Sequence, residues 1–356
     1  MHLTDTTALF SAWCHALARD QPKADNLAPL VHRLLCDFSV LLDCRVLKHR
    51  VSTSISGLRL PSQQFSLALP DNAVLRSMSD DELSELSSHD ITFGRDKDVL
   101  SYSVSSCLVY ESESPFRLEP TPAQELLTST VDVEAHQYTV DVLRALHVLK
   151  AGRAGIFLAT SELTPSLLPF LNGFSSFPLY RPPFASLELT PEDVVPFIEI
   201  LRSLRAGIRD EVRIAVDRLV DAEARLSPVD ALVDAAIGLE VLLNPMDTAE
   251  LAFRVALNYA HLGTPELRRE RYDRIRTIQK TRNRVVHGGL NIQSQGAPLI
   301  HDHAGLAKAC LRDAVKSFLL DSTLTGNKKL DAEFWLDRIL PANIVPAIET
   351  PPTMPE

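Results

Sequence analysis

The residues best suited to chemistry form one short run, from Arg282 to His287, followed by two glycines. Histidine titrates near neutrality and can act as a general acid or base. Arginine is a permanent cation that suits phosphate. On a helix, Asn283 and His287 lie one turn apart on the same face, and the last helical turn favours a protonated imidazole. These residue types indicate RNA cleavage, although a histidine at a helix end also commonly caps backbone carbonyls.

The helix that must carry this run is strongly basic. It is predicted to extend from about Glu266 to His287, to end at Gly288, and to hold eight arginines and lysines against three acids. In a chain of formal net charge -10 this is a local positive ridge suited to phosphate contacts. The alternative is a solvated face stabilised by pairs such as Glu270 with Arg274. The candidate RNA-binding residues on the ridge are Arg276, Lys280 and Arg284.

Two acids upstream, Asp234 and Glu240, are supporting candidates for the same site. The structural alternative is that each is a buried acid paired with an arginine of the basic helix. The run from His301 to His303 suggests a metal pair, but two histidines two residues apart without further ligands favour a polar loop or a helix start. We therefore expect no metal and no cofactor. No nucleophile elbow, P-loop or dinucleotide-binding glycine pattern is present.

The N-terminal region, residues 1–185, is predicted to be mixed α/β. Its expected elements are two helices over 6–44, strand segments within 45–118, a short helix or loop with solvated acids at 80–82, a helix over 138–151 ending at Gly152, and a buried strand over 155–159. The proline- and aromatic-rich stretch 177–184 is predicted to be a connector.

The C-terminal region is predicted to be all-helical over 186–325. Thr190-Pro191 and Ser227-Pro228 are typical helix starts. Apolar periodicity then predicts helices over about 229–243, 249–262, 266–287 and 304–320, which gives a bundle of four or five helices. Residues 326–356 form an extension with a proline-rich tail. The fold class is therefore α+β overall, a mixed α/β region followed by an all-α bundle.

Composition limits the class of protein. Hydrophobic residues make up 45% and charged residues 23%, as in ordinary globular chains. The acidic net charge excludes a nucleic-acid coat protein with a broad basic surface. Five cysteines without paired spacing favour reduced thiols over disulfides or zinc. With no apolar stretch of membrane-spanning length and no signal-like start, we expect a cytoplasmic protein without a membrane partner.

Arg282-x4-His287, with polar Asn283 after the arginine, resembles the R-x4–6-H motif of the HEPN superfamily. The blocks 234–243, 250–257 and 282–288 follow the order seen in ApeA-like HEPN domains, and the resemblance covers roughly residues 205–322. Two departures stand out. Lys280-Thr281 precede the motif, and Gly289 occupies the position where some HEPN toxins carry a regulatory tyrosine, so that regulation is not implied.

The resemblance implies a HEPN-type helical bundle with metal-independent endoribonuclease activity, acting in anti-phage defence or stress. His287 would be the general acid or base, Arg282 would stabilise the phosphorane charge, and Asn283 would orient the histidine or the phosphate. It also implies a homodimer with a shared cleft and an N-terminal region that senses a trigger or an antitoxin. The alternatives are a non-catalytic module that binds RNA, nucleotide or protein, and a purely structural assembly protein.

Overall fold

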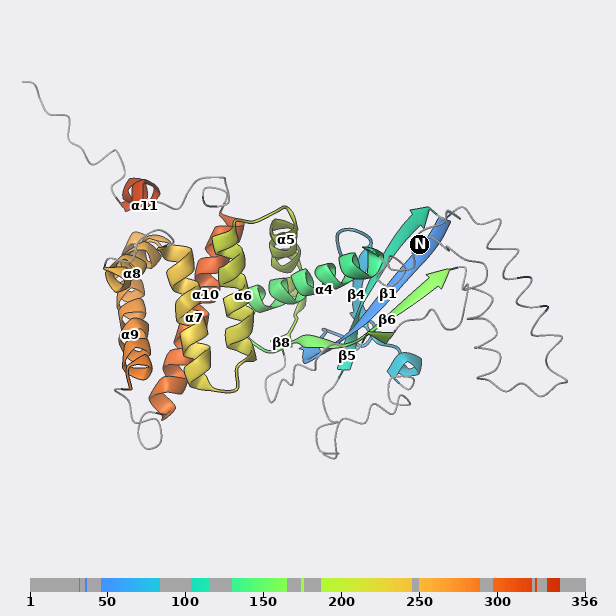
Figure 1. The fold of residues 1–356 in the computed structure, drawn as a ribbon, viewed down its shortest axis with the longest axis horizontal. Helices are drawn as coiled ribbons and strands as arrows, with labels where there is room; N and C mark the ends of the chain where they lie inside the picture. The colour runs from blue at the N-terminus through green and yellow to red at the C-terminus, as the bar shows by residue number, and fades with distance from the viewer. Residues whose placement is uncertain are drawn as a thin grey trace, which may run out of the picture. The chain divides into compact units, whose positions relative to one another are not determined.

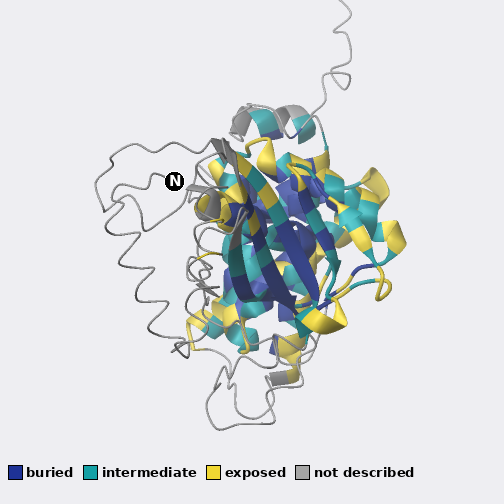
Figure 2. Ribbon diagram, turned by 90° about the vertical axis from the view of Figure 1, so that its right-hand side faces the viewer, coloured by how far each residue is buried: buried dark blue, intermediate teal, exposed yellow. Residues whose placement is uncertain are grey.

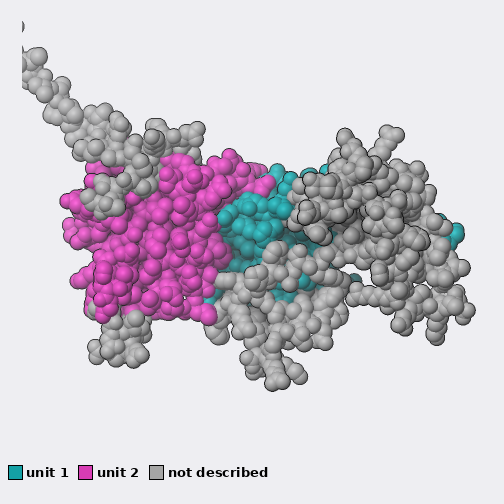
Figure 3. Space-filling model, viewed as in Figure 1, with its two compact units in different colours: residues 1–146, 152–198 teal, residues 147–151, 199–356 magenta. Residues whose placement is uncertain are grey.

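A computed structural model describes residues 46–83, 104–115, 130–164, 187–244, 250–288, 297–321 and 332–339, together with residues 32, 36, 174, 175 and 324. The chain forms two compact units. Unit 1 comprises Met1–Leu146 and Gly152–Ile198, and unit 2 comprises His147–Ala151 and Glu199–Glu356 (Figure 3). The structure confirms the predicted α+β class, because the strands lie before residue 189 and the elements that the structure describes beyond it are helical.

Unit 1 contains a sheet of six strands in the order β3-β4-β5-β1-β6-β7, in which neighbouring strands are antiparallel. A separate parallel pair joins β2 to β8. The strands, visible in Figure 1, are β1 (Val46–Ser56), β2 (Leu58–Arg59), β3 (Ser66–Ala68), β4 (Ala73–Ser77), β5 (Val104–Pro115), β6 (Gly155–Thr164), β7 (Phe174–Ser175) and β8 (Leu187–Glu188).

The first part of the central strand β1 buries alternate residues, as a sheet with one covered face requires, and residues 53–56 are all buried. Val51 and Ile55 are buried, whereas Lys48 and Arg50 are exposed and pair with glutamates of β5. The helix α4 (Thr130–Leu149) meets the buried face through Tyr138, whose hydroxyl donates to the Pro70 carbonyl at 2.7 Å. Figure 2 shows this apolar layer as dark-blue strands.

Several local predictions for unit 1 are confirmed, and one is wrong. The strand predicted at 155–159 extends to Thr164, and α4 is followed by Gly152 at a φ of 137°. The acids at 80–82 begin a short helical turn as expected, but Glu82 is not simply solvated. Its carboxylate accepts a hydrogen bond from Arg76 Nη1 at 2.7 Å. The helices predicted within 6–44 (except the helical residues 32 and 36), the connector over 177–184 and the tail beyond 341 lie outside the described residues.

Unit 2 is built from helices. Two of the predicted caps are present: Ser227 accepts a hydrogen bond from the Asp230 amide at 3.3 Å, and in the last part of unit 1 the Thr190 amide donates to Asp193 at 2.8 Å. After the short turn η4 (Pro191–Asp193) the helices are α5 (Val194–Arg205), which spans the division between the units, α6 (Asp210–Ala224), α7 (Pro228–Leu243), α8 (Leu251–His261), α9 (Arg268–Val286, preceded by the turn η5, Pro265–Leu267), α10 (Ala297–Leu320) and α11 (Ala332–Ile339).

The helix α7 is the centre of this unit and contacts α6, α8, α9 and α10 (Figure 1). Its predicted apolar face, including Leu232, Ala235 and Leu239, is fully buried. A Cβ added at Gly238 would lie 2.7 Å from Leu311 of α10, so the missing side chain allows these helices to pack closely. Among the described helices, none combines the length and apolarity that crossing a bilayer requires.

Candidate functional site

The helix α9 brings the motif residues to its C-terminal end. Its inner face buries Ile275, Ile278 and Thr281. At the end of the helix, the His287 amide donates to the Asn283 carbonyl at 3.0 Å, and Gly288 follows at a φ of 69°. A left-handed residue at this position is a common helix terminator and favours glycine. The predicted role of Gly288 in turning the chain away is confirmed.

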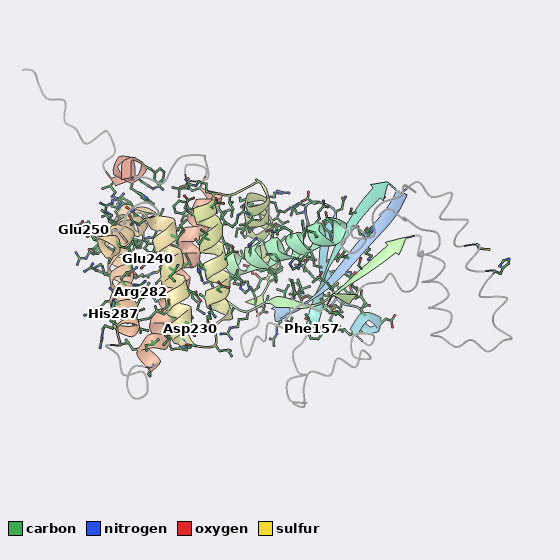
Figure 4. The ribbon with its side chains drawn as sticks, viewed as in Figure 1. Phe157, Asp230, Glu240, Glu250, Arg282 and His287 are labelled. Carbon is green, nitrogen blue, oxygen red and sulfur yellow. The ribbon has the colours of Figure 1, made fainter. Side chains whose placement is uncertain are left out.

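The side chains of Arg282 and His287 project from different sides of α9. Five helical residues separate them by about 140° around the axis. Asn283 and His287 are exposed, and the His287 imidazole makes no hydrogen bond to another described residue, whereas Arg282 is half-buried. Figure 4 labels Arg282, His287 and Glu240 in this part of the bundle. The apolar pattern of the sequence predicts that Val286 continues the stripe begun by Ile275 and Ile278, and this prediction is wrong. The Val286 side chain is 52% exposed, because the helix ends beyond the packed seam.

Arg282 faces α7, where its Nη2 lies 3.7 Å from Glu240 Oε2. The other Glu240 oxygen accepts a hydrogen bond from Gln279 at 3.2 Å. The predicted pairing of Glu240 with an arginine of the basic helix is therefore confirmed. The Arg282 Nη1 donates to Asn283 Oδ1 at 3.2 Å, and its buried Nε has no hydrogen-bond partner among the described residues. The guanidinium is thus held in place with donor capacity left over.

Asp234 does not join this group. Its carboxylate is buried and binds Arg218 at 3.0 Å and Arg225 at 2.7 Å, both from the α6 side of α7. The expected pairing with an arginine of the basic helix is wrong, because Asp234 and Glu240 lie six residues apart and point to different neighbours of α7. The hydrogen bond to Asp234 raises the pKa of Arg225. Asp234 therefore fixes α6 against α7 and is not part of the site.

The basic ridge separates into paired and unpaired cations. Arg269 binds Asp273 at 2.9 Å, and Arg274 binds Glu270 as predicted. Arg276, Lys280 and Arg284 are exposed and form no ion pair with any residue that the structure describes. These three recur every four residues, and His287 follows three residues after Arg284. Helical periodicity therefore puts the unpaired cations and His287 on one outer face of α9.

A further arginine of the ridge is structural, which sequence reasoning missed. Arg271 binds Asp313 of α10 at 2.7 Å, and its guanidinium lies 4.1 Å from the centre of the Tyr259 ring. The Tyr259 hydroxyl donates to the same Asp313 at 3.0 Å, and burial raises the pKa of that hydroxyl. Gly263 leaves room for the Arg271 stem, since an added Cβ would lie 2.5 Å from its Cδ. No local pattern signals this network, because its members come from three helices.

A buried charge cluster was also missed. Glu223 of α6 is 3% exposed and binds both Arg312 and Lys308 of α10. Arg312 Nε also donates to the His147 carbonyl at 2.9 Å. The helical spacing of these residues gives no hint that they meet. The cluster fastens α10 to α6 and to the last turn of α4, which belongs to unit 2, and it lies apart from the motif residues in sequence.

The His301–His303 run is helical, because α10 begins at Ala297 and not near 304 as predicted. Two helical residues two positions apart point about 200° away from each other, so the two histidines do not converge on one ion. His303 Nδ1 instead lies 2.7 Å from Thr281 Oγ1 of α9. Within the described ranges no group of three or more histidines, cysteines or carboxylates is arranged to hold a metal ion.

Comparison of the chain with protein-family models, with curated proteins and with solved structures finds no match. The candidate site therefore stands on its own geometry: an exposed histidine at a helix end, a half-buried arginine with unused donors, and three unpaired cations on the outer face of the same helix.

Proposed function

We propose that this protein is a metal-independent endoribonuclease of the HEPN type, with its site at the C-terminal end of α9. The observation that carries the proposal is the state of Arg282 and His287. The imidazole is exposed, and the half-buried guanidinium is held in place by Glu240 and Asn283. A titratable group and a positioned cation at one helix end supply what phosphodiester cleavage by transesterification requires.

In this reaction the ribose 2′-hydroxyl attacks the adjacent phosphorus. The new bond joins O2′ to phosphorus, the bond from phosphorus to O5′ breaks, and the products are a 2′,3′-cyclic phosphate and a 5′-hydroxyl. His287 takes the proton from O2′ or supplies the proton to O5′. Arg282 stabilises the extra negative charge of the phosphorane through the Nη hydrogens that its contacts with Asn283 and Glu240 leave free. Asn283 accepts a hydrogen bond from Arg282 and thereby orients the guanidinium.

The unpaired cations of α9 supply the RNA-binding surface in this proposal. Arg276, Lys280 and Arg284 rise along the helix in steps of about 6 Å, so they form a row that leads to His287. Phosphates neutralised by such a row release counterions, which makes binding dependent on salt. Replacing any one of the three by alanine is expected to weaken binding to all RNA sequences and to lower the slope of log affinity against log salt by about one.

The central experiment compares wild type with His287→Ala and Arg282→Ala on total RNA, in the presence of EDTA. His136→Ala, which removes an exposed histidine of α4, is the matched control. We expect cleavage by wild type and the control, and loss of cleavage in both site variants. Full activity of a folded His287→Ala protein would refute the assignment. Loss of wild-type cleavage in EDTA, restored by one divalent ion, would refute the metal-independent route.

The second candidate function is a non-catalytic RNA-binding module. It is favoured by the same row of unpaired cations, which binds phosphate whether or not His287 acts. The discriminating result is intact RNA after incubation with protein that binds it in a salt-dependent way.

The endoribonuclease proposal also includes a cellular role. It comprises anti-phage or stress-related action, a cytoplasmic location, and sensing of a trigger or an antitoxin by residues 1–185. They are tested by expressing wild type and His287→Ala in cells and examining total RNA.

A further inference from the structure

A hydrogen bond joins α9 to α10 beside the candidate site. Thr281 Oγ1 lies 2.7 Å from His303 Nδ1. Thr281 is 5% exposed and immediately precedes Arg282, while His303 is half-buried in the second turn of α10. The contact is thus a polar link between two packed helices, at the level of α9 where the motif begins.

The hydroxyl of Thr281 is used differently from those of comparable residues. Helical serines and threonines often donate to the carbonyl four residues earlier. Thr277 does so to Asp273 at 2.9 Å, and Ser317 does so to Asp313 at 3.1 Å. Within the described structure, the Thr281 hydroxyl instead forms its hydrogen bond with His303. When it donates to Nδ1, the neutral imidazole carries its proton on Nε2, so the bond selects one tautomer.

The two consecutive residues Thr281 and Arg282 hold α9 from different sides. They are about 100° apart around the helix axis. Thr281 reaches α10 through His303, and Arg282 reaches α7 through Glu240. Together these contacts fix both the rotation of α9 and its position along the axis, just before the turn that presents Asn283 and His287.

We propose that His303 is a positioning residue for the site, acting through Thr281 to hold the last turn of α9 in register. This inference rests on the proposed function for its catalytic consequence, but its structural consequence is independent of that function. His303 does not need to touch RNA. Its loss lets the end of α9 rotate, which moves His287 relative to Arg282 and costs turnover without weakening RNA binding.

Three variants distinguish the effect of the hydrogen bond from the effect of the imidazole ring itself. His303→Ala removes both. Thr281→Val keeps the shape of the threonine and the histidine but removes the hydroxyl. His303→Asn places its side-chain oxygen close to where Nδ1 lies, so it keeps an acceptor for Thr281 and removes the imidazole ring.

The first measurement is amide hydrogen exchange in the full-length protein at residues 284–287. We expect His303→Ala and Thr281→Val to speed exchange there by about fivefold to tenfold, which corresponds to one neutral hydrogen bond. His303→Asn should restore most of the protection. Equal exchange in all four proteins, or no rescue by His303→Asn, overturns the inference. Thr281→Val keeps the test valid if His303→Ala fails to fold.

The second measurement is RNA cleavage at saturating and limiting RNA. The expected pattern is a fall of about tenfold in kcat, at unchanged KM, for His303→Ala and Thr281→Val, with recovery in His303→Asn. Loss of activity in His303→Asn together with full activity in Thr281→Val would mean that His303 acts directly, and would overturn the positioning role. If the exchange pattern is as expected but wild type cuts no RNA, the proposed function fails and the positioning role of His303 stands.

Discussion

The Arg282 side chain serves stability and the proposed chemistry at once. Its partner Glu240 is 14% exposed in its side chain, so removing the guanidinium leaves a largely buried carboxylate with Gln279 as its one remaining partner among the described residues. From the sequence alone, a residue at an exposed helix end is expected to tolerate alanine with the fold intact, since truncation there creates no core cavity. The structure instead predicts a cost, because breaking one side of a mostly buried ion pair costs more than the pair contributes.

We expect Arg282→Ala to lower the free energy of unfolding by about 1–2 kcal/mol, and His287→Ala to change it by less than about 0.5 kcal/mol. Adding Glu240→Gln to Arg282→Ala should recover part of the loss, since no buried charge remains. A double-mutant cycle by urea unfolding measures this coupling. Strictly additive effects would show that the two side chains do not interact.

Glu82 provides a pH-dependent contribution in unit 1. The hydrogen bond from Arg76 lowers the pKa of this carboxyl from 4.5 to about 2. A carboxyl with a lowered pKa stabilises the folded state above its ordinary pKa, and this stabilisation is lost as the pH falls from about 4.5 towards 2. Because about a third of the Glu82 side chain is exposed, we expect a contribution of only about 1 kcal/mol at neutral pH.

The measurement is urea unfolding of wild type and Glu82→Gln at pH 7 and near pH 3. The variant should be less stable at pH 7, and the difference should shrink at the lower pH. A difference that stays constant between the two would mean that the Arg76 contact does not depend on the carboxylate charge.

At the scale of elements, two glycines are predicted to respond in opposite ways to alanine. Gly152, which follows α4, has a φ of 137°, and an added Cβ would lie 2.8 Å from the Leu187 backbone. Gly305 lies inside α10 with nothing within 4 Å of its added Cβ. Gly152→Ala should destabilise by about 2 kcal/mol or more through backbone strain and the clash. Gly305→Ala should stabilise by about 0.5–1 kcal/mol through helix propensity.

Thermal and urea unfolding of the two variants beside wild type test this pair. Because both substitutions add one methyl group, the opposite signs isolate the effect of backbone conformation and space. Stabilisation by Gly152→Ala would show that the close approach to β8 does not restrict this position.

At the scale of the whole molecule, we expect a homodimer in which two copies of Arg282 and His287 share one cleft. One proton-transfer group must activate O2′ and another must protonate O5′, and a twofold interface supplies two copies of His287 without further sequence. The half-exposed Val286 next to His287 would be covered in such an interface. The two rows of unpaired cations would also be brought together, which offsets the acidic net charge near the RNA.

Light scattering at micromolar concentration measures the oligomeric state. Mixing Arg282→Ala chains with His287→Ala chains tests the shared site, because a mixed dimer keeps one arginine and one histidine and should regain part of the activity. Each variant mixed with itself is the control. A strictly monomeric protein that still cuts RNA would exclude the shared cleft.

The sequence alone determined the features that depend on neighbours along the chain. The caps at Thr190 and Ser227, the apolar face of α7, the end of α9 at Gly288 and the i,i+4 pair of Glu270 with Arg274 follow from local backbone geometry and helical period. The α+β class follows in the same way, because strand-like segments occur in the N-terminal region and helical periodicity continues through the C-terminal region.

Tertiary structure decided which side chains meet. Asp234 and Glu240 are both acids of α7, yet one binds α6 and the other binds α9, since six residues of helix turn them towards different neighbours. The same reason applies to Thr281 with His303, to Arg271 with Tyr259, and to Glu223 with Arg312. A helix period fixes which residues share a face, but only the packing of the other helices determines what that face contacts.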